Sequence, residues 1–225
     1  MPAPGSVIVV GAGPGLGVSI AARFARAGFA TGLIARQRAT LDAATAAVAA
    51  SGWPPVRLAA AVGDAGDQSS LDGAWAELAE QIGPPTVAVY NAMAVVRGDP
   101  TTIDPADLGA SLAVNITGAL RCAQLAAAAM KAAGTGTILF TGGGLALEPF
   151  PAAASLAAGK AGARNLAFSL ALELEPAGIH VAVVTVCGRV EPGGAFDPDA
   201  IADAYWDLHA QAPGSWERER VIADG

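Results

Sequence analysis

The chain has 225 residues, 53% of them hydrophobic, which suits one sizeable domain with a full core and makes two domains a tight fit. Its formal net charge of -7 excludes the clustered basic surface that nucleic acids and anionic membranes require. A small molecule is therefore the expected partner.

Short β-branched or apolar runs alternate with longer alanine-rich helical patterns along the chain. The runs expected as strands are residues 6–10, 30–35, 56–62, 86–91, 136–141 and 180–186. Each is continuously apolar, which is typical of strands buried on both faces of a parallel sheet. The order predicts an α/β fold, a single Rossmann-type domain over residues 1–225 with a doubly wound parallel sheet of six to seven strands.

The C-terminal region predicts one further helix and one further strand. Residues 197–211 begin with aspartates and carry apolar residues at helical spacing, and the short run 219–225 could supply the seventh strand. Glycine- and proline-rich stretches such as residues 51–55 separate the elements without forming a domain linker.

The cysteines and the N-terminus bear on compartment. Cys122 and Cys187 lie in apolar segments without a Cys or His at metal-ligand spacing, so neither a disulfide framework nor a metal site is expected. The first residues lack the basic start and apolar centre of a signal peptide, and no apolar run approaches membrane-spanning length. We expect a soluble cytoplasmic protein without a membrane partner.

A glycine-rich loop follows the first expected strand and precedes a helical pattern. Gly11, Gly13, Gly15 and Gly17 would allow a tight turn, close approach of the backbone to a pyrophosphate, and an anion at the helix N-terminus. Such a loop serves nicotinamide dinucleotides, FAD and S-adenosylmethionine.

The end of the second expected strand discriminates among these ligands. NAD, FAD and the methyl donor usually require an acidic residue there for ribose hydroxyls, whereas this chain has Ala35 followed by Arg36. An arginine at that place can pair with a 2′-phosphate, which favours NADP over NAD. The alternative is that Arg36 and Arg38 simply open a solvated loop.

The stretch ASLAAGKAG places Lys160 among small and apolar side chains, although the chain has only one other lysine, Lys131. An ordinary surface position on an alanine-rich helix is the usual explanation for a lysine. Other residues of the chain suggest a more specific explanation for Lys160.

Together these features resemble the short-chain dehydrogenase/reductase family over nearly the whole chain. Of the family's opening TGxxxGxG, Gly11, Gly15 and Gly17 match and Val10 replaces the threonine. The residues that match further family positions are Asp64 for the adenine contact, Asn91 and Ala92 of the NNAG motif, Asn115 in VNITG, and Lys160 of YxxxK.

The resemblance implies a role for each of these residues. Cofactor contacts are expected from Gly11, Gly13, Pro14, Gly15, Leu16, Gly17, Arg36, Asp64, Ala65, Asn91, Ala92, Lys160, Gly188 and Val190. Lys160 would bind the nicotinamide ribose and Asn115 would hold a relay water, which makes these two the expected catalytic residues. Asn115 read alone would be an ordinary helix residue or a helix kink.

The chemistry-bearing positions depart from the family. Leu156 stands at the place of the catalytic tyrosine and Gly143 at that of the catalytic serine, while Met93 and Pro192 replace other motif residues. Ser155, Thr141 or a water between Asn115 and Lys160 are the candidates for a replacement proton donor.

Two functions follow as hypotheses. The first is an NADP(H)-dependent oxidoreductase that transfers a hydride to or from a carbonyl, alcohol or activated alkene. The second is a catalytically silent nucleotide-binding or sensing protein that acts through dimer contacts. The apolar run LAFSLALEL after Lys160 favours a homodimer or homotetramer, as is common in that family.

Overall fold

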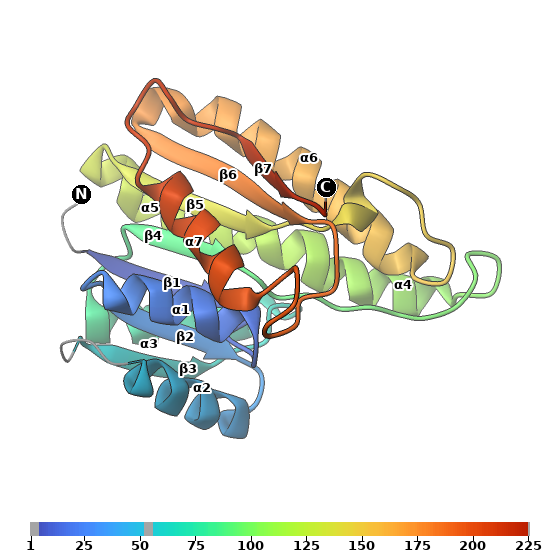
Figure 1. Ribbon diagram of the computed structural model, residues 1–225, viewed down its shortest axis with the longest axis horizontal. Coiled ribbons are helices and arrows are strands. Elements are labelled where there is room, and N and C mark those ends of the chain that lie inside the picture. Colours follow the sequence, from blue (N-terminus) through green and yellow to red (C-terminus); the bar gives the residue numbers. More distant parts are fainter. Residues whose placement is uncertain (1–4, 52–55, 225) are drawn as a thin grey trace.

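A computed structural model describes residues 5–51 and 56–224. Its strands form one parallel sheet in the order β3-β2-β1-β4-β5-β6-β7, so the predicted doubly wound sheet is confirmed with seven strands (Figure 1). The strands are β1 (Ser6–Val10), β2 (Ala30–Ala35), β3 (Leu58–Val62), β4 (Val87–Tyr90), β5 (Gly136–Thr141), β6 (Ile179–Val186) and β7 (Glu219–Ile222). The N-terminal residues 1–4, most of the expected turn at 51–55 and residue 225 lie outside the described residues.

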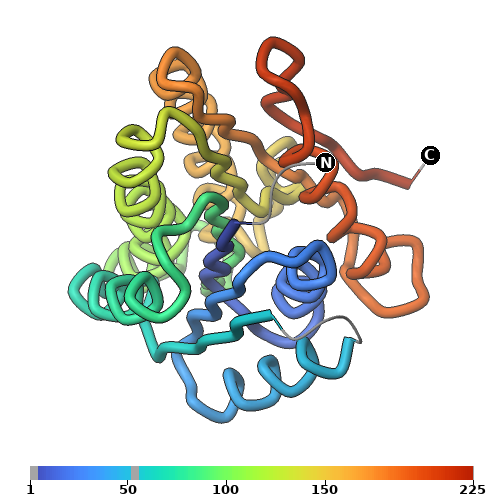
Figure 2. The backbone as a smooth tube through the Cα atoms, turned by 90° about the vertical axis from the view of Figure 1, so that its left-hand side faces the viewer, coloured from blue at the N-terminus to red at the C-terminus, as the bar shows by residue number. Residues whose placement is uncertain are grey.

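Helices cover both faces of the sheet (Figures 1 and 2). The α-helices are α1 (Leu16–Arg26), α2 (Arg38–Ala50), α3 (Gln68–Ile82), α4 (Pro105–Leu112), α5 (Ala119–Ala133), α6 (Ala154–Leu174) and α7 (Pro198–His209). Helices α1, α2 and α7 share one hydrophobic core with the sheet, and α3, α5 and α6 share the other.

The continuous apolar strands explain this two-sided burial. In β1, Val7 and Val9 belong to the core beneath α1 and α7, whereas Ile8 and Val10 belong to the core beneath α3 and α5. Successive side chains of a strand point to opposite faces, so a strand between two helical layers needs apolar residues at every position.

Helices α4 and α5 are joined by a π-helical turn, Ala113–Gly118, into one long helix. By length and composition alone this helix, Pro105–Ala133, could cross a membrane, so the expectation that no apolar segment reaches that length was wrong. Ala123, Ala126 and Met130 of α5 are buried in the hydrophobic core that α3, α5 and α6 share with the sheet. The alanine-rich sequence of α5 is thus accounted for by packing within the domain.

The strand order reverses between β1 and β4, and this reversal positions the site. From β1 the chain proceeds outward to β2 and β3, then returns to pair β4 with the free side of β1. In open α/β sheets a crevice forms outside the carboxyl ends of the strands at such a reversal. Gly11 follows β1 and Asn91 follows β4 at this place.

Candidate functional site

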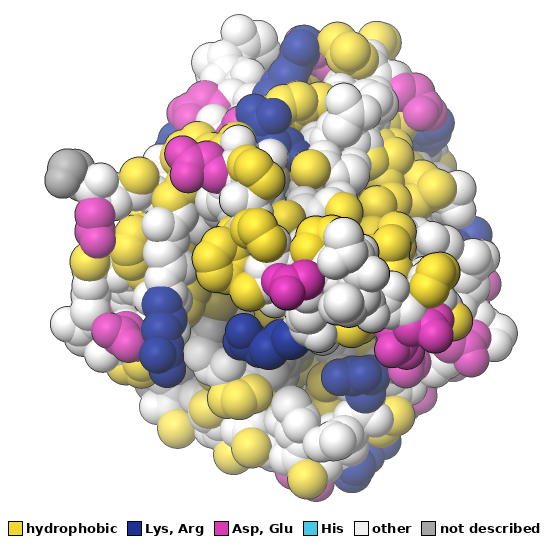
Figure 3. Space-filling model, turned by 90° about the vertical axis from the view of Figure 1, so that its right-hand side faces the viewer, with side chains coloured by type: hydrophobic (Ala, Val, Ile, Leu, Met, Phe, Trp, Pro, Cys, Tyr) yellow, Lys and Arg dark blue, Asp and Glu magenta, His cyan; other side chains and the backbone are white. Residues whose placement is uncertain are grey.

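A cavity of about 1440 Å³ opens at the carboxyl ends of the strands. Figure 3 looks onto this side and shows hydrophobic side chains around a hollow, with Lys and Arg side chains beside it. The predicted residues that line the cavity are Gly11, Gly13, Pro14, Gly15, Leu16, Gly17, Arg36, Asp64, Ala65, Asn91, Ala92, Lys160, Gly188 and Val190. Asn115 is not among the lining residues.

The glycine loop approaches the sheet closely on one side and leaves space on the other. A Cβ on Gly17 would lie 2.4 Å from the carbonyl oxygen of Gly11, so a side chain there would push α1 away from β1. Gly15 has a φ of 88°, in the left-handed region that favours glycine. A Cβ on Gly13 or Gly15 would meet nothing within 4 Å, because these residues face the open cavity.

The N-terminus of α1 has no side-chain cap, as is also the case for α2 and α6. Asp67, Asp104 and Asp197 cap α3, α4 and α7 by accepting hydrogen bonds from first-turn amides. Helix α1 begins after Gly15 with no side-chain cap and no acidic residue in its first turn. Its amide donors and positive dipole therefore face the cavity, which fits a pyrophosphate.

The far end of the cavity, at β2 and β3, carries a cation and a fixed carboxylate. The side chain of Arg36 is exposed beside Gln37 and Thr40, and within residues 5–51 and 56–224 it takes part in no ion pair. The Oδ1 atom of Asp64 accepts a hydrogen bond from the Gly66 amide at 2.8 Å, which fixes the turn after β3.

A directed chain of hydrogen bonds runs from α7 to the glycine loop. The Nδ2 atom of Asn91 donates to the carbonyl of Gly11 at 2.9 Å, and the Thr141 hydroxyl donates to Oδ1 of Asn91 at 2.8 Å. The phenol oxygen of Tyr205 lies 2.6 Å from Oγ1 of Thr141. Because the proton of Thr141 is used on Asn91, Tyr205 is the donor in this last bond.

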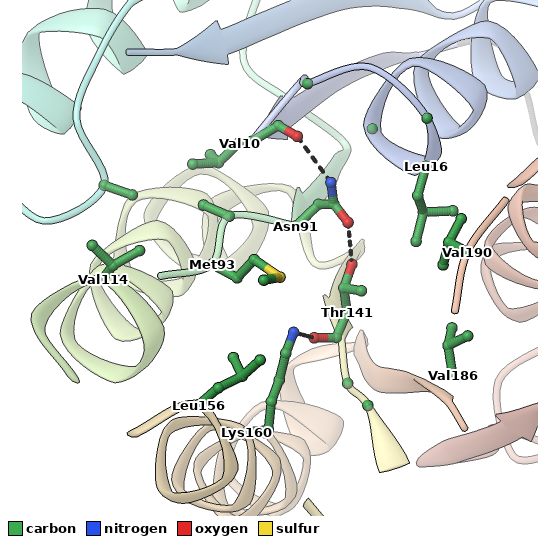
Figure 4. Close-up of a pocket in the computed structure, with 18 of the residues that line it drawn as sticks. Val10, Leu16, Asn91, Met93, Val114, Thr141, Leu156, Lys160, Val186 and Val190 are labelled. Carbon is green, nitrogen blue, oxygen red and sulfur yellow. Dashed lines mark hydrogen bonds between the residues drawn. The ribbon is translucent and has the colours of Figure 1, made fainter. Parts of the chain in front are cut away.

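Sequence reasoning considered Thr141 but missed Tyr205. The only available signal was a tyrosine on the apolar face of the C-terminal helix, where a buried phenol requires a hydrogen-bond partner. Figure 4 shows Asn91, Thr141 and Lys160 converging at the centre of the cavity.

Lys160 enters the same cluster from α6. Its Nζ donates to the carbonyl oxygen of Thr141 at 2.6 Å, and the residue is 9% exposed. Burial lowers the pKa of this ammonium to about 8, because the charged form loses its water. Leu156 lies one turn before Lys160 and lines the same cavity, and a Cβ on Gly143 would lie 3.8 Å from Cε of Lys160.

Asn115 lies within the π-helical turn, where its side chain binds the protein's own backbone. Its Oδ1 accepts from the Ala94 amide at 3.0 Å and its Nδ2 donates to the Ala94 carbonyl at 2.7 Å. The Ser155 hydroxyl makes the same pair of contacts with Val96, at 2.8 and 3.0 Å. These two side chains clamp the loop after β4 beside the cavity.

The π-helical turn is also bonded to the sheet through one of its backbone carbonyls. The phenol of Tyr90, from β4, donates a hydrogen bond to the carbonyl of Val114. This bond ties the turn to the sheet, and burial raises the pKa of Tyr90 far above its ordinary value. Tyr90 is therefore a structural donor.

The residues after β6 close one wall of the cavity. A Cβ on Gly188 would lie 1.9 Å from the ring of Phe196, so only glycine fits beneath that ring. Cys187 and Val190 line the cavity on either side of it. Among the described residues that line the cavity there is no tyrosine and no serine.

The parallel sheet, the glycine loop and the cavity at the strand reversal define a dinucleotide-binding α/β protein. A profile of short chain dehydrogenases matches residues 6–193. The chain belongs to the short chain dehydrogenase family.

Solved structures support the fold over the full length. The chain is 28% identical to a short-chain dehydrogenase from Rhodopseudomonas palustris, with a TM-score of 0.87 and 100% of both chains covered. It is 30% identical to a metagenomic short-chain oxidoreductase in complex with NADP, with a TM-score of 0.86 and 97% of both chains covered.

A curated relative differs in its reported activity. The chain is 30% identical over 182 residues to "Inactive 2-(S)-hydroxypropyl-CoM dehydrogenase 2" of Xanthobacter autotrophicus (strain ATCC BAA-1158 / Py2), with 77% of this chain and 76% of the relative covered. Similarity to the family is therefore compatible with both functions expected from the sequence.

Proposed function

We propose that this protein binds NADP(H) in the cavity and catalyses hydride transfer to or from a carbonyl, alcohol or activated alkene. The proposal rests on the observation that a single cavity is lined both by the uncapped start of α1 and by the buried amine of Lys160. The metagenomic relative whose structure contains NADP supports the choice of cofactor.

The residues present fit a bound dinucleotide phosphate. The glycine loop and the α1 amides would hold the pyrophosphate, Arg36 the 2′-phosphate, and Asp64 with Ala65 the adenine side. Asn91 and Lys160 would hold the nicotinamide side. When bound, the reduced nicotinamide supplies the hydride.

Cofactor preference tests the role of Arg36. Calorimetric titration should show tighter binding of NADPH than of NADH, and Arg36→Ala should weaken NADPH binding about tenfold, or roughly 1.4 kcal/mol, while leaving NADH binding unchanged. Arg38→Ala is the matched control, because Arg38 lies outside the residues that line the cavity. Equal affinities of the unmodified protein for the two cofactors would contradict the assignment.

A second candidate function is nucleotide binding without turnover. It is favoured by Leu156 and Gly143, which we infer to stand at the positions of the family's catalytic tyrosine and serine, and by the relative named inactive. Incubation with NADPH and a panel of carbonyl compounds separates the two functions, since binding without oxidation of NADPH would favour the second.

Restoring the missing groups tests the same inference. The double variant Leu156→Tyr with Gly143→Ser places a phenol one helical turn from Lys160, so we expect carbonyl reduction to increase by about 100-fold or more. Normal folding and NADPH binding without any gain would show that other residues of the substrate side have also changed.

We also propose that the protein forms a homodimer or homotetramer. The side chain of Leu172 on α6 is 61% exposed and belongs to the apolar run noted in the sequence, which supports a helix-mediated contact. Light scattering coupled to size exclusion would measure the mass, and a monomer at micromolar concentration would contradict the proposal.

A further inference from the structure

Three side chains near the reaction end of the cavity carry a hydroxyl or amide proton, namely Ser155, Asn115 and Thr141. Each of these protons is already bonded to another group of the protein. The Ser155 hydroxyl is fully buried and bonds both the amide and the carbonyl of Val96. The Asn115 amide bonds the carbonyl of Ala94 and the Ser111 hydroxyl. Neither group faces the cavity, so neither can give a proton to a ligand there.

Thr141 lines the cavity but its proton is also committed. The carbonyl of Gly11 can only accept, which forces Nδ2 of Asn91 toward it and leaves Oδ1 of Asn91 as the acceptor for the Thr141 hydroxyl. Tyr205 cannot replenish that proton, because burial raises its pKa well above its ordinary value and the phenolate would be left in an apolar core.

Lys160 remains. One N–H bond of its ammonium is used on the carbonyl of Thr141 at 2.6 Å. Within the part of the chain that the structure describes, no other hydrogen bond or ion pair involves its Nζ. Leu156 offers only hydrocarbon beside it, and the absence of a side chain at Gly143 leaves space next to the lysine stem.

Building on the proposed function, we propose that Lys160 is itself the proton donor of the reduction, acting on the substrate oxygen directly or through one water. During reduction the carbonyl carbon gains a hydride, which NADPH supplies with its two electrons, and the carbonyl oxygen gains the proton of one Nζ–H bond. Lys160 is left as a neutral amine and regains a proton from solvent, so the step balances.

The surroundings of Lys160 suit this role. Its pKa is lowered to about 8 by burial, and a general acid works best when its pKa is close to the operating pH. The other titratable groups that line the cavity on this side are Cys187 and Arg189 after β6 and Glu148, and the side chains of Arg189 and Glu148 are exposed. Arg164 of α6 is paired with Glu219 of β7, and Tyr205 lies behind Thr141.

The experiment uses the fact that the chain contains two lysines. Lys160→Arg keeps a positive charge and hydrogen-bond donors but cannot release a proton near neutral pH. We expect kcat for carbonyl reduction to fall by at least about 100-fold while NADPH affinity changes by less than about threefold. Lys131→Arg is the matched control, because Lys131 is half exposed and paired with Glu173 at 3.0 Å, and its kcat should be unchanged.

A titration of the lysine carbons gives a readout that is independent of activity. With 13C-labelled lysine the full-length protein should show two Cε signals, which Lys131→Arg would assign. We expect the Lys160 signal to titrate at about pH 8 and kcat for reduction to decline above the same pH. Lys160→Met, which keeps the stem and removes the charge, serves if the arginine variant does not fold.

The outcomes separate the inference from the function on which it rests. Retained turnover in a folded Lys160→Arg or Lys160→Met variant, or a Lys160 signal that titrates above about pH 10, would overturn the role of Lys160 while leaving the oxidoreductase intact. Loss of turnover in Cys187→Ala with Lys160→Arg active would assign the proton to the thiol. NADPH binding without reduction of any carbonyl by the unmodified protein would overturn both.

Discussion

Helix α7 meets strand β5 at two places, and the two contacts differ in what they support. At the carboxyl end of β5, Tyr205 bonds Thr141, which continues through Asn91 to the glycine loop. At the amino end, Nδ1 of His209 lies 2.9 Å from the Thr137 hydroxyl, amid the rings of Phe24, Phe29 and Trp206. Similar side-chain bonds between the same two elements thus reach the cavity at one end and only the core at the other.

The His209 end should dominate the response of stability to acid. Burial lowers the pKa of His209 to about 4, below its ordinary 6.5, so between these values the unfolded chain binds more protons than the folded one. Stability is therefore complete above about pH 7 and falls as the pH drops toward 4, by up to about 3 kcal/mol from this residue. Urea unfolding at about pH 8, 6 and 5 measures the loss.

The variant His209→Gln should flatten that pH dependence without changing NADPH affinity at about pH 8, because His209 is remote from the cavity. His180 contributes acid sensitivity of the same sign, since burial also lowers its pKa, and part of the slope should remain. If the pH dependence of stability were unchanged in His209→Gln, the prediction that His209 at the amino end of β5 causes the loss of stability in acid would be contradicted.

The hydrogen-bond chain that starts at Tyr205 ends at the glycine loop, and Gly17→Ala in this loop should destabilise the protein nearly as much as acid does through His209. The added Cβ would lie 2.4 Å from the Gly11 carbonyl and 3.1 Å from Nδ2 of Asn91, so we expect a loss of about 2 kcal/mol and strongly weakened NADPH binding. Gly73→Ala in α3 is the control, because its Cβ would meet no neighbour and alanine should stabilise that helix by about 1 kcal/mol. Denaturant midpoints and calorimetry distinguish the two variants.

Tyr205→Phe tests the middle of the chain with a smaller expected effect. Removing the phenol hydroxyl leaves the partly buried oxygen of Thr141 without this donor, at a cost of about 1.5 kcal/mol. Unlike His209→Gln, this variant should also weaken NADPH binding, because Thr141 would be free to turn away from Asn91. Loss of stability with unchanged affinity would mean that the Tyr205 contact serves only the core.

The smallest expected quantity is the coupling between Tyr205 and Thr141. A double-mutant cycle of Tyr205→Phe and Thr141→Val should give an interaction energy of about 1 kcal/mol in unfolding experiments. The pair Tyr205→Phe with Thr137→Val should be additive, since Thr137 contacts His209 instead. Equal coupling in both pairs would contradict the chain as described.

The sequence predicted those parts of the molecule that depend on local pattern. Six strands follow from short apolar runs, and the seventh lies in the short run at 219–225. The glycine loop was expected at the cavity from its place after the first strand, and Lys160 from its match to the YxxxK motif of the family that the chain resembles. The roles of these residues in catalysis and cofactor binding stay predictions that the experiments above test.

What the sequence did not predict depends on partners distant along the chain. The Tyr205–Thr141 bond requires the register of α7 against β5, and the clamp of Asn115 on Ala94 requires the π-helical turn, which has no clear signature in VNITG. The identity of a buried polar group's partner is a tertiary property, whereas apolar periodicity is a local one.

The π-helical turn Ala113–Gly118 also sets the direction in which the side chains of α5 point relative to those of α4. An α-helix advances by about 100° for each residue, so one residue accommodated as a bulge re-aims everything that follows it. Deleting a single residue from this turn would let α4 and α5 merge into one regular helix, and Ala123, Ala126 and Met130 would rotate away from the sheet. The damage would come from the changed count of residues between α4 and the core face of α5, and deletion of Asn115 would also remove its clamp on Ala94.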